Sequence, residues 1–248
     1  MVERLLFRLA GPMASFGDIT VGEIRSSWAE PSKSAVLGLV AAALGVPRTE
    51  PARHAALHRA FSYAVRVDGR PQPLRDFHTS QVPSARKNRR YSTRSQELAD
   101  PDGLNTILSQ RWSWQGFAAV ACLTPRGEEP GDPGAIRDAL RRPAFPLFLG
   151  RKANPLGWPL QPEVIAADTL AEAFAAYDQT LPALERVGWA KPPAWPAPGV
   201  TIWTDLGEGL PVHGRRRRRD TVRDRRAWTF DEREEASLEF SAPATGGA

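Results

Sequence analysis

Cysteine is almost absent from this chain, and its absence limits the covalent and metal chemistry available. The one cysteine, Cys122, excludes an internal disulfide and leaves no set of thiolates for a cysteine-based zinc site. Cys122 stands in the apolar run 117–123, which predicts a buried and inert thiol. The four histidines come without an HExxH pattern, and the sequence contains no GxGxxG or Walker motif. We therefore expect neither a metal nor a cofactor.

Long hydrophobic runs are also missing. The longest uncharged apolar run covers residues 35–46, which is too short to cross a bilayer as a helix. Charged residues interrupt the N-terminal apolar stretch at Glu3, Arg4 and Arg8, unlike the apolar core of a signal peptide. We expect a soluble, cytoplasmic protein with no membrane partner.

Lysine is scarce while arginine is plentiful. Only four of the 33 basic residues are lysines, the formal net charge is +5, and the isoelectric point is about 9.9. A basic protein attracts polyanions, and nucleic acid is the obvious candidate. A GC-rich genome would also raise the arginine content, so the clustering of the charges has to decide between the two explanations.

Short apolar segments in a fixed order predict the fold class. Residues 2–9 are typical of a first strand, and Ser32 is placed to cap a helix over 33–44. Strict alternation predicts a strand over 61–67, and the run 117–123 suits a central strand. A helix over 133–140 and a last strand after Pro143 are then expected. This order predicts an α+β protein with a ferredoxin-like, RNA-recognition-motif-like core.

The second half of the chain is less periodic. A helix is expected over residues 170–177 and strands over 200–203 and 226–230, so we expect a less regular, β-rich C-terminal part. The 248 residues include 23 prolines and 20 glycines, which fits one domain with long connections.

A long polar segment interrupts the predicted core. After a third strand expected to begin over 74–78, residues 79–106 stay almost entirely polar, which is too long for an ordinary connection. Phosphates neutralise crowded cations, and an aromatic ring stacks on an unpaired base. A solvated, disordered loop explains a lone charge run at least as well, but the place of this run on the expected scaffold favours RNA. The segment contains Arg86, Lys87, Arg89, Arg90, Tyr91 and Arg94.

Two other basic groups give weaker signals. Five consecutive arginines occupy residues 215–219, with more at 223, 225 and 226, and they indicate either phosphate contact or a flexible solubilising loop. Gly150 precedes Arg151 and Lys152 at the end of an apolar run, where two cations would meet a polyanion entering a cleft.

The tryptophans and histidines have ordinary structural explanations as well as functional ones. Trp112 and Trp114 alternate as on a strand, and core packing is favoured over base stacking. His54 and His58 have the spacing of a solvated helix face. His78 follows Asp76 closely and is more typical of a hydrogen bond that shapes a loop than of a general base.

Several blocks of the sequence, in order, resemble one known family. They are residues 5–17, residues 31–34 leading into 37–45, residues 74–79, residues 117–125, and residues 147–156, which read LFLGRKANPL. These blocks are similar to the CasD family, the Cas-five subunit of the type I-E Cascade complex in the RAMP superfamily. The likeness covers about residues 4–160 and departs from the family over residues 112–115 and at Asn154, where the family has cysteine.

The resemblance implies a noncatalytic subunit that binds guide RNA. A ferredoxin-like body, residues 1–77 and 112–248, would carry a basic thumb over 78–111. Such a subunit grips the 5′ handle of the guide (crRNA) and caps the backbone filament, beside the backbone and large subunits, and meets target DNA only within the complex. The residues expected to line the RNA path are Arg25, Trp28, Lys33, Arg75, His78, Arg86, Lys87, Arg89, Arg90, Tyr91, Arg94, Arg111, Arg151 and Lys152.

Two other functions remain open on the sequence. Relatives in type I-C systems process the guide precursor, so a metal-independent endoribonuclease is the main alternative. His78, Tyr91, Lys87 or Lys152 would then have to converge on one phosphate, and the spacing predicts no such convergence. A free-standing DNA-binding regulator fits the charge but lacks a recognisable helix-turn-helix pair.

Overall fold

The computed structural model describes residues 1–18, 20, 22–68, 71–84, 90–99, 103–180, 200–205, 212–224, 227 and 229–240. Its elements are β1 (Val2–Ala14), β2 (Phe16–Gly17), β3 (Ile24–Arg25), β4 (Ser27–Trp28), α1 (Lys33–Ala43), α2 (Pro51–Ala60), β5 (Phe61–Val67), β6 (Gln72–Pro83), α3 (Arg94–Leu98), β7 (Leu104–Pro125), α4 (Pro133–Arg141), β8 (Glu163–Ala167), α5 (Leu170–Asp178), β9 (Val200–Thr204), β10 (Val212–Asp224) and β11 (Thr229–Phe240).

One large sheet organises these elements. Its strands follow the order β10-β11-β9-β5-β7-β1-β8, and both β3 and β6 add to β7. The pairs are antiparallel except for the short parallel pair of β3 with β7. The predicted α+β class is therefore confirmed in its coarse form, a mostly antiparallel sheet with few helices.

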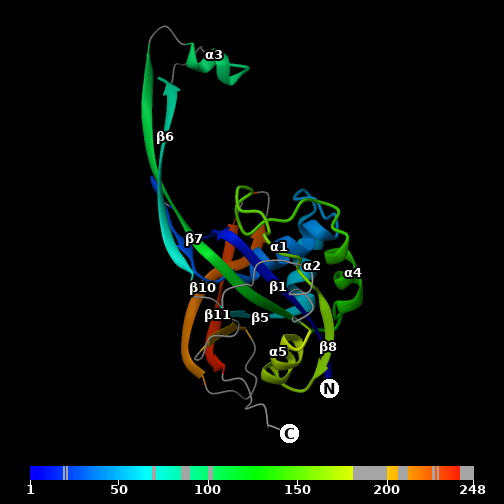
Figure 1. The fold of residues 1–248 in the computed structure, drawn as a ribbon. Helices are drawn as coiled ribbons and strands as arrows, with labels where there is room; N and C mark the ends of the chain where they lie inside the picture. The colour runs from blue at the N-terminus through cyan, green and yellow to red at the C-terminus, as the bar shows by residue number, and fades with distance from the viewer. Residues whose placement is uncertain are drawn as a thin grey trace.

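Helices cover both faces of the central strands (Figure 1). Leu5, Phe7 and Leu9 point into a core with α1 and α4, whereas Leu6 points into a second core with α5. A strand that is buried on both faces has to be apolar at consecutive positions, which explains the unbroken apolar run in β7. Cys122 lies in the second core and is fully buried, as predicted.

Most elements with a strong local signal are confirmed. Ser32 caps α1 by accepting a hydrogen bond from the backbone N–H of Ala35 at 3.1 Å. The predicted strand β5 and helices α4 and α5 are present, and β8 is the strand expected after Pro143. The helices α1, α2 and α4 gather on one side of the sheet (Figure 1).

A long two-stranded arm projects from the body (Figure 1). We use "arm" for β6, α3 and residues 104–115 of β7. Its strands pair in unbroken register from Gln72 opposite Gln115 to Pro83 opposite Leu104. β7 therefore runs through the body and out into the arm, and Gly116, with φ of +63°, stands at the junction. This is a conformation that glycine adopts more easily than other residues.

One open alternative from the sequence is excluded, and two expectations are wrong. The arginines 215–219 lie within β10 and pair with β11 in a regular ladder, which excludes the flexible loop. We call β10 and β11 the ribbon. His54 and His58 are buried instead of solvated, and the helix α2 that carries them contacts β10. Trp112 and Trp114 are only half-buried and belong to neither core.

Among the described residues, no helix combines the length and hydrophobicity that crossing a bilayer requires.

Candidate nucleic-acid interface

Three arginines from distant parts of the chain meet at the base of the arm. Arg25 on β3 lies opposite Arg111 on β7 in the parallel register. Arg151 comes from the loop before β8 and donates hydrogen bonds to the carbonyl oxygens of Trp112, at 3.1 Å, and Arg25, at 3.5 Å. These bonds hold the Arg151 guanidinium against β3 and against the strand β7 that carries Arg111.

The electrostatics of this cluster favour a bound anion. The pKa of Arg151 is lowered from its ordinary value, mainly by burial and further by repulsion from Arg111 and Arg25. A phosphate between these guanidiniums would relieve the repulsion and accept charge-assisted hydrogen bonds. Arg25 and Arg111 are exposed, so the cluster is accessible from solvent.

The loop that carries Arg151 is held against β1 by close backbone packing. Gly150 has φ of +83°, and a Cβ atom there would lie 1.8 Å from the carbonyl oxygen of Ser15. The backbone N–H of Ser15 donates to the oxygen of Leu149 at 3.0 Å. Only glycine fits this contact. Gly150 therefore fixes the position of the backbone that carries Arg151 and the exposed Lys152.

Two further predicted residues lie on opposite faces of the arm near its base. Arg75 on β6 stands over the ring of Trp112, with its guanidinium carbon 5.9 Å from the ring centroid. His78 pairs with Asp76 at 2.7 Å, and Asp76 lies opposite Arg111 in the ladder. Strand alternation places Arg75 and His78 on different faces.

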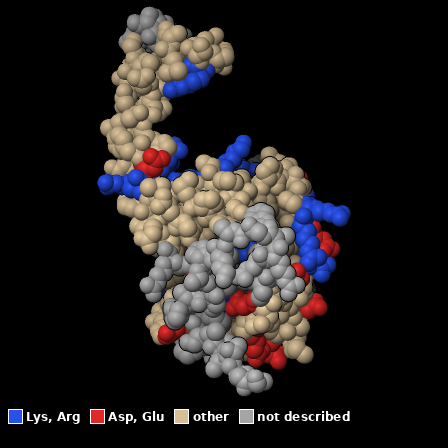
Figure 2. Space-filling model, viewed as in Figure 1, with Lys and Arg blue, Asp and Glu red and all other residues tan. Residues whose placement is uncertain are grey.

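Basic side chains gather where the arm meets the body, with a small acidic spot beside them (Figure 2). Farther out, Arg94 starts α3 and pairs with Glu97 at 2.6 Å. Arg90 is exposed and Tyr91 is half-buried. The predicted residues Arg86, Lys87 and Arg89 lie outside the described residues.

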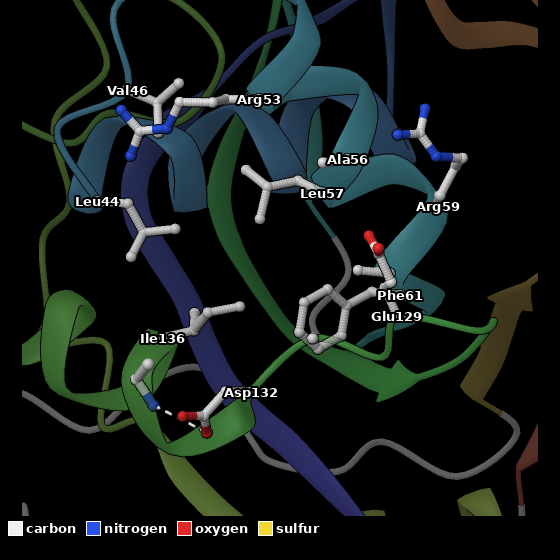
Figure 3. Close-up of a pocket in the computed structure, with 13 residues that line it drawn as sticks. Leu44, Val46, Arg53, Ala56, Leu57, Arg59, Phe61, Glu129, Asp132 and Ile136 are labelled. Atoms are coloured by element: carbon white, nitrogen blue, oxygen red, sulfur yellow. Dashed lines mark hydrogen bonds between the residues drawn. The ribbon is translucent and has the colours of Figure 1, made fainter.

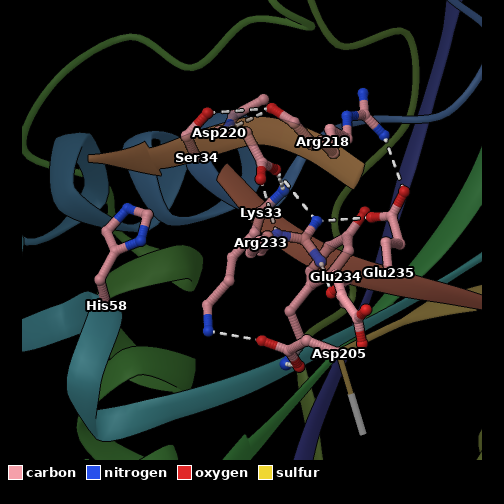
Figure 4. Close-up of polar contacts among 12 residues, drawn as sticks. Lys33, Ser34, His58, Asp205, Arg218, Asp220, Arg233, Glu234 and Glu235 are labelled. Carbon is pink, nitrogen blue, oxygen red and sulfur yellow. Dashed lines mark hydrogen bonds and ion pairs between the residues drawn. The ribbon is translucent and has the colours of Figure 1, made fainter. Parts of the chain in front are cut away.

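Lys33 is engaged inside the protein. Its Nζ atom contacts Asp205 at 2.6 Å with only 4% of the side chain exposed, and its backbone N–H donates to Asp220 at 2.8 Å (Figure 4). Burial lowers the pKa of Lys33, and Asp205 partly offsets this effect. The predicted RNA contact of Lys33 stays a prediction, and the buried pair argues against it.

Trp28 is also engaged, by the ribbon. The guanidinium carbons of Arg216 and Arg218 lie 4.8 and 5.3 Å from its ring centroid. Both arginines also pair with Glu30 and Glu235. The indole N–H of Trp114 donates to the oxygen of Ser27 at 3.1 Å, so the segment that carries Trp28 is tied to the arm as well.

An apolar pocket lies on the side of the sheet that α1, α2 and α4 cover (Figure 3). The residues that line it are not those of the arginine cluster. Its volume is about 330 Å³, and Leu44, Leu57, Phe61 and Ile136 contribute to its walls. The described lining residues include none of those predicted for the RNA path. Within the described ranges, no group of three or more His, Cys, Asp or Glu side chains is arranged to hold a metal ion.

Sequence reasoning named Arg25, Arg111 and Arg151 but missed the arginines that hold Trp28. Arg216 and Arg218 stand in the run 215–219, where identical residues give no signal of which side chains are buried. Only their distant partners Glu30 and Glu235 distinguish them.

The sequence of this chain is similar to those of known CRISPR-associated proteins. The family described as CRISPR-associated protein (Cas_Cas5) matches residues 4–235. CRISPR system Cascade subunit CasD of Escherichia coli (strain K12) is 32% identical over 168 residues, which cover 63% of this chain and 68% of the relative.

Two solved structures are similar over nearly the whole length. A chain of a CRISPR RNA-guided surveillance complex has a TM-score of 0.64 at 26% identity, covering 98% of this chain and 92% of that one. A second structure, titled as a crystal structure of a Cas protein, has a TM-score of 0.61 at 24% identity and covers 96% and 95% of the two chains. The match to the family over residues 4–235 and the identity to CasD together show that the chain belongs to the Cas5 (CasD) family of CRISPR-associated proteins.

Proposed function

We propose that this chain is a noncatalytic RNA-binding subunit of a type I-E Cascade surveillance complex. In this role it grips the 5′ handle of the crRNA, caps the backbone filament and contacts the backbone and large subunits. In the cell it meets target DNA only as part of the complex, and it works in the cytoplasm. The name of the Escherichia coli relative, a Cascade subunit, supports the assembly.

The convergence of Arg25, Arg111 and Arg151 at the base of the arm carries the proposal. Three guanidiniums from three segments meet there, and the carboxylate nearest in the ladder, Asp76, is paired with His78. Phosphate oxygens are the natural partners of such a cluster because guanidinium forms two parallel hydrogen bonds to them. The ring of Trp112 beside Arg75 offers a surface on which an unstacked base can lie.

The arm takes the role of the basic thumb, whose predicted bounds were residues 78–111. The strand order β8-β1-β7-β5, with α1 and α4 packed on one face, supports a ferredoxin-like core. Because α5 packs on the other face, guide RNA binds at the arm and its base instead of across the sheet. Of the predicted residues, we assign phosphate contact to Arg25, Arg75, Arg111, Arg151 and Lys152, and we assign a role in holding the body together to Lys33 and Trp28.

A metal-independent endoribonuclease is the second candidate. The observation that favours it is the contact of His78 with Asp76 at 2.7 Å, beside Arg111 in the ladder. A carboxylate orients a histidine for proton transfer, and an arginine stabilises charge on a phosphate. Of the residues predicted to converge on one phosphate, Lys87 lies outside the described residues.

One experiment separates the two candidates. The purified chain is incubated with a guide carrying its native repeat handle, with a scrambled-handle guide, and with an unprocessed precursor, and both retention and cleavage are followed across salt concentrations. Handle-selective retention of intact RNA is the expected result. Cleavage within the repeat in the presence of a chelator, abolished by His78→Ala, would replace the binding role with the nuclease.

A further inference from the structure

The arginines of β10 form two sets that face opposite ways. Arg216 and Arg218 face inward, with 22% and 4% of their side chains exposed. Their neighbours face outward, and we call Arg215, Arg217, Arg219 and Arg223 the outward row. The exposed side-chain fractions of the outward row are 66%, 79%, 52% and 72%. The inward arginines pack inside the fold, whereas the outward row is exposed to solvent.

The acids opposite the outward row hold it loosely. Arg217 and Arg219 share the single carboxylate of Glu232, at 4.0 and 3.4 Å. Arg215 and Arg223 lie 3.6 and 3.9 Å from Glu234 and Asp231. Exposed ion pairs of this kind contribute little to stability, so a phosphate replaces them at small cost. Four arginines against three carboxylates also leave an excess of positive charge.

The spacing of the outward row suits a regular polyanion. Alternate residues on a strand are about 6.7 Å apart, which is comparable to the separation of successive phosphates along a nucleic-acid strand. β10 is the outermost strand in the sheet order, and its ladder with β11 is regular from Arg215 to Arg219, whereas two register shifts separate Arg219 from Arg223. Guanidinium groups at this spacing can contact consecutive phosphates without moving the backbone.

The side chains of the outward row favour double-stranded over single-stranded nucleic acid. Arg216, Arg218 and Arg233, all on the inward side of the ribbon, lie over the rings of Trp28, Trp203 and Tyr63. Sites for single strands combine cations with exposed rings on which bases stack. The outward row consists of exposed cations, and a duplex, whose bases are already stacked, presents its phosphates to such a row without needing rings to receive its bases.

We propose that the outward row binds the sugar-phosphate backbone of a DNA duplex without regard to sequence. Contacts to phosphates position a protein on the duplex and carry no sequence information by themselves. The row belongs to β10, whereas the proposed guide interface belongs to β3, β7 and the loop before β8. The two surfaces can therefore be tested independently.

The test measures binding of the full chain to three fluorescent probes across a salt series. The probes are a duplex DNA of random sequence, a duplex RNA of the same length, and a single-stranded guide with its handle. The test variant carries Arg215→Gln, Arg217→Gln and Arg219→Gln. The matched control carries Arg137→Gln, Arg141→Gln and Arg142→Gln, three arginines on or next to α4. Circular dichroism confirms that both are folded, and a variant with lysine at the three row positions tests charge.

The expected result is specific to the row and to the duplex. The test variant binds duplex DNA at least about tenfold more weakly at moderate salt, and its slope of log affinity against log salt falls by about two to three. The lysine variant keeps most of the slope, the α4 control matches the wild type, and guide binding is unchanged. The proposal is overturned if wild type does not bind duplex DNA at low salt, if both glutamine variants behave alike, or if only duplex RNA or the guide is affected.

Discussion

Arg216 lies against Trp203, with its guanidinium carbon 3.7 Å from the ring centroid, and Trp28 lies 4.8 Å away from the same guanidinium. Glu235 and Glu30 contact the same arginine. This arrangement joins the ribbon to β4, which precedes α1 and follows Arg25. The C-terminal part of the chain therefore supports the segment that leads into the proposed guide interface.

Replacing Arg216 with methionine is expected to lower the free energy of unfolding by about 3 kcal/mol, because two largely buried carboxylates lose a partner. Arg217→Met is the matched control, since Arg217 is 79% exposed and its ion pair is 4.0 Å long. The control should change stability by less than about 0.5 kcal/mol. Urea denaturation measures both variants, and equal effects would show that the inward contacts do not stabilise the ribbon.

Guide binding should weaken when the arm-base charges are removed. Arg25→Gln combined with Arg111→Gln removes two guanidiniums, and the slope of log affinity against log salt should fall by about 1.4 for a single strand. Arg151 is left in place because it also supports the backbone through Trp112. Arg137→Gln with Arg142→Gln serves as the control. A slope that stays at its wild-type value would rule out phosphate contact at this cluster.

The glycine before Arg151 should tolerate no side chain. In Gly150→Ala the new Cβ would lie 1.8 Å from the oxygen of Ser15, so the loop must move and carry Arg151 with it. Gly22→Ala is the control, because Gly22 has a similar positive φ of +81° but open space around it. We expect about 1 kcal/mol of destabilisation at Gly22 from backbone strain alone, and clearly more at Gly150.

Guide affinity provides a second measurement on the same pair of glycine variants. Gly150→Ala should weaken retention of the guide even under conditions where the protein remains folded, whereas Gly22→Ala should not. Similar melting temperatures for the two variants would contradict the close packing between the loop and β1.

Stability should depend on pH through Glu235. Burial by itself raises the pKa of Glu235, but Arg233, Arg218 and Arg216 together bring it below the ordinary value of 4.5. The unfolded chain therefore binds a proton more readily than the folded one, so stability rises with pH. The contribution is complete above about 4.5 and is lost as the pH falls through the lower folded value.

Melting temperatures measured from neutral to acidic pH check this effect. Glu235→Gln should be less stable at neutral pH and should lose less stability on acidification than the wild type. Glu234→Gln is the control, because the neighbouring Glu234 is 69% exposed and should follow the wild-type curve. Parallel curves for all three proteins would refute the role of Glu235.

The elements predicted well are those whose signal is local. The alternation of Phe61, Tyr63 and Val65 requires no partner to be recognised, and Ser32 caps α1 through contacts within three residues. The ribbon could not be predicted in this way, because five identical arginines hide the alternation of a strand. Its inward side chains are defined by Glu30 and Glu235, which are far apart in sequence.

The candidate site was predicted as a set of residues but not as a geometry. Arg25, Arg111 and Arg151 carry charge that a sequence displays, yet only the parallel pairing of β3 with β7 brings the first two together. Lys33 looked equally available, and its burial depends on Asp205, which stands directly after β9. A sequence shows which residues are charged, but it does not show which distant residue forms an ion pair with each of them.

Because β7 is one continuous strand in the body and the arm, a force on the tip of the arm is transmitted to the body. The inner part of the strand is hydrogen-bonded to β1 on one side and β5 on the other, so it cannot turn without breaking two ladders at once. A sideways load on the tip therefore acts as a torque on the base of the arm, where β7 also pairs with β1 as far as Trp114 and with β3 at Gln110 and Arg111. Because displacement grows with distance from the held base, bending moves the tip more than it moves the arginines near the base.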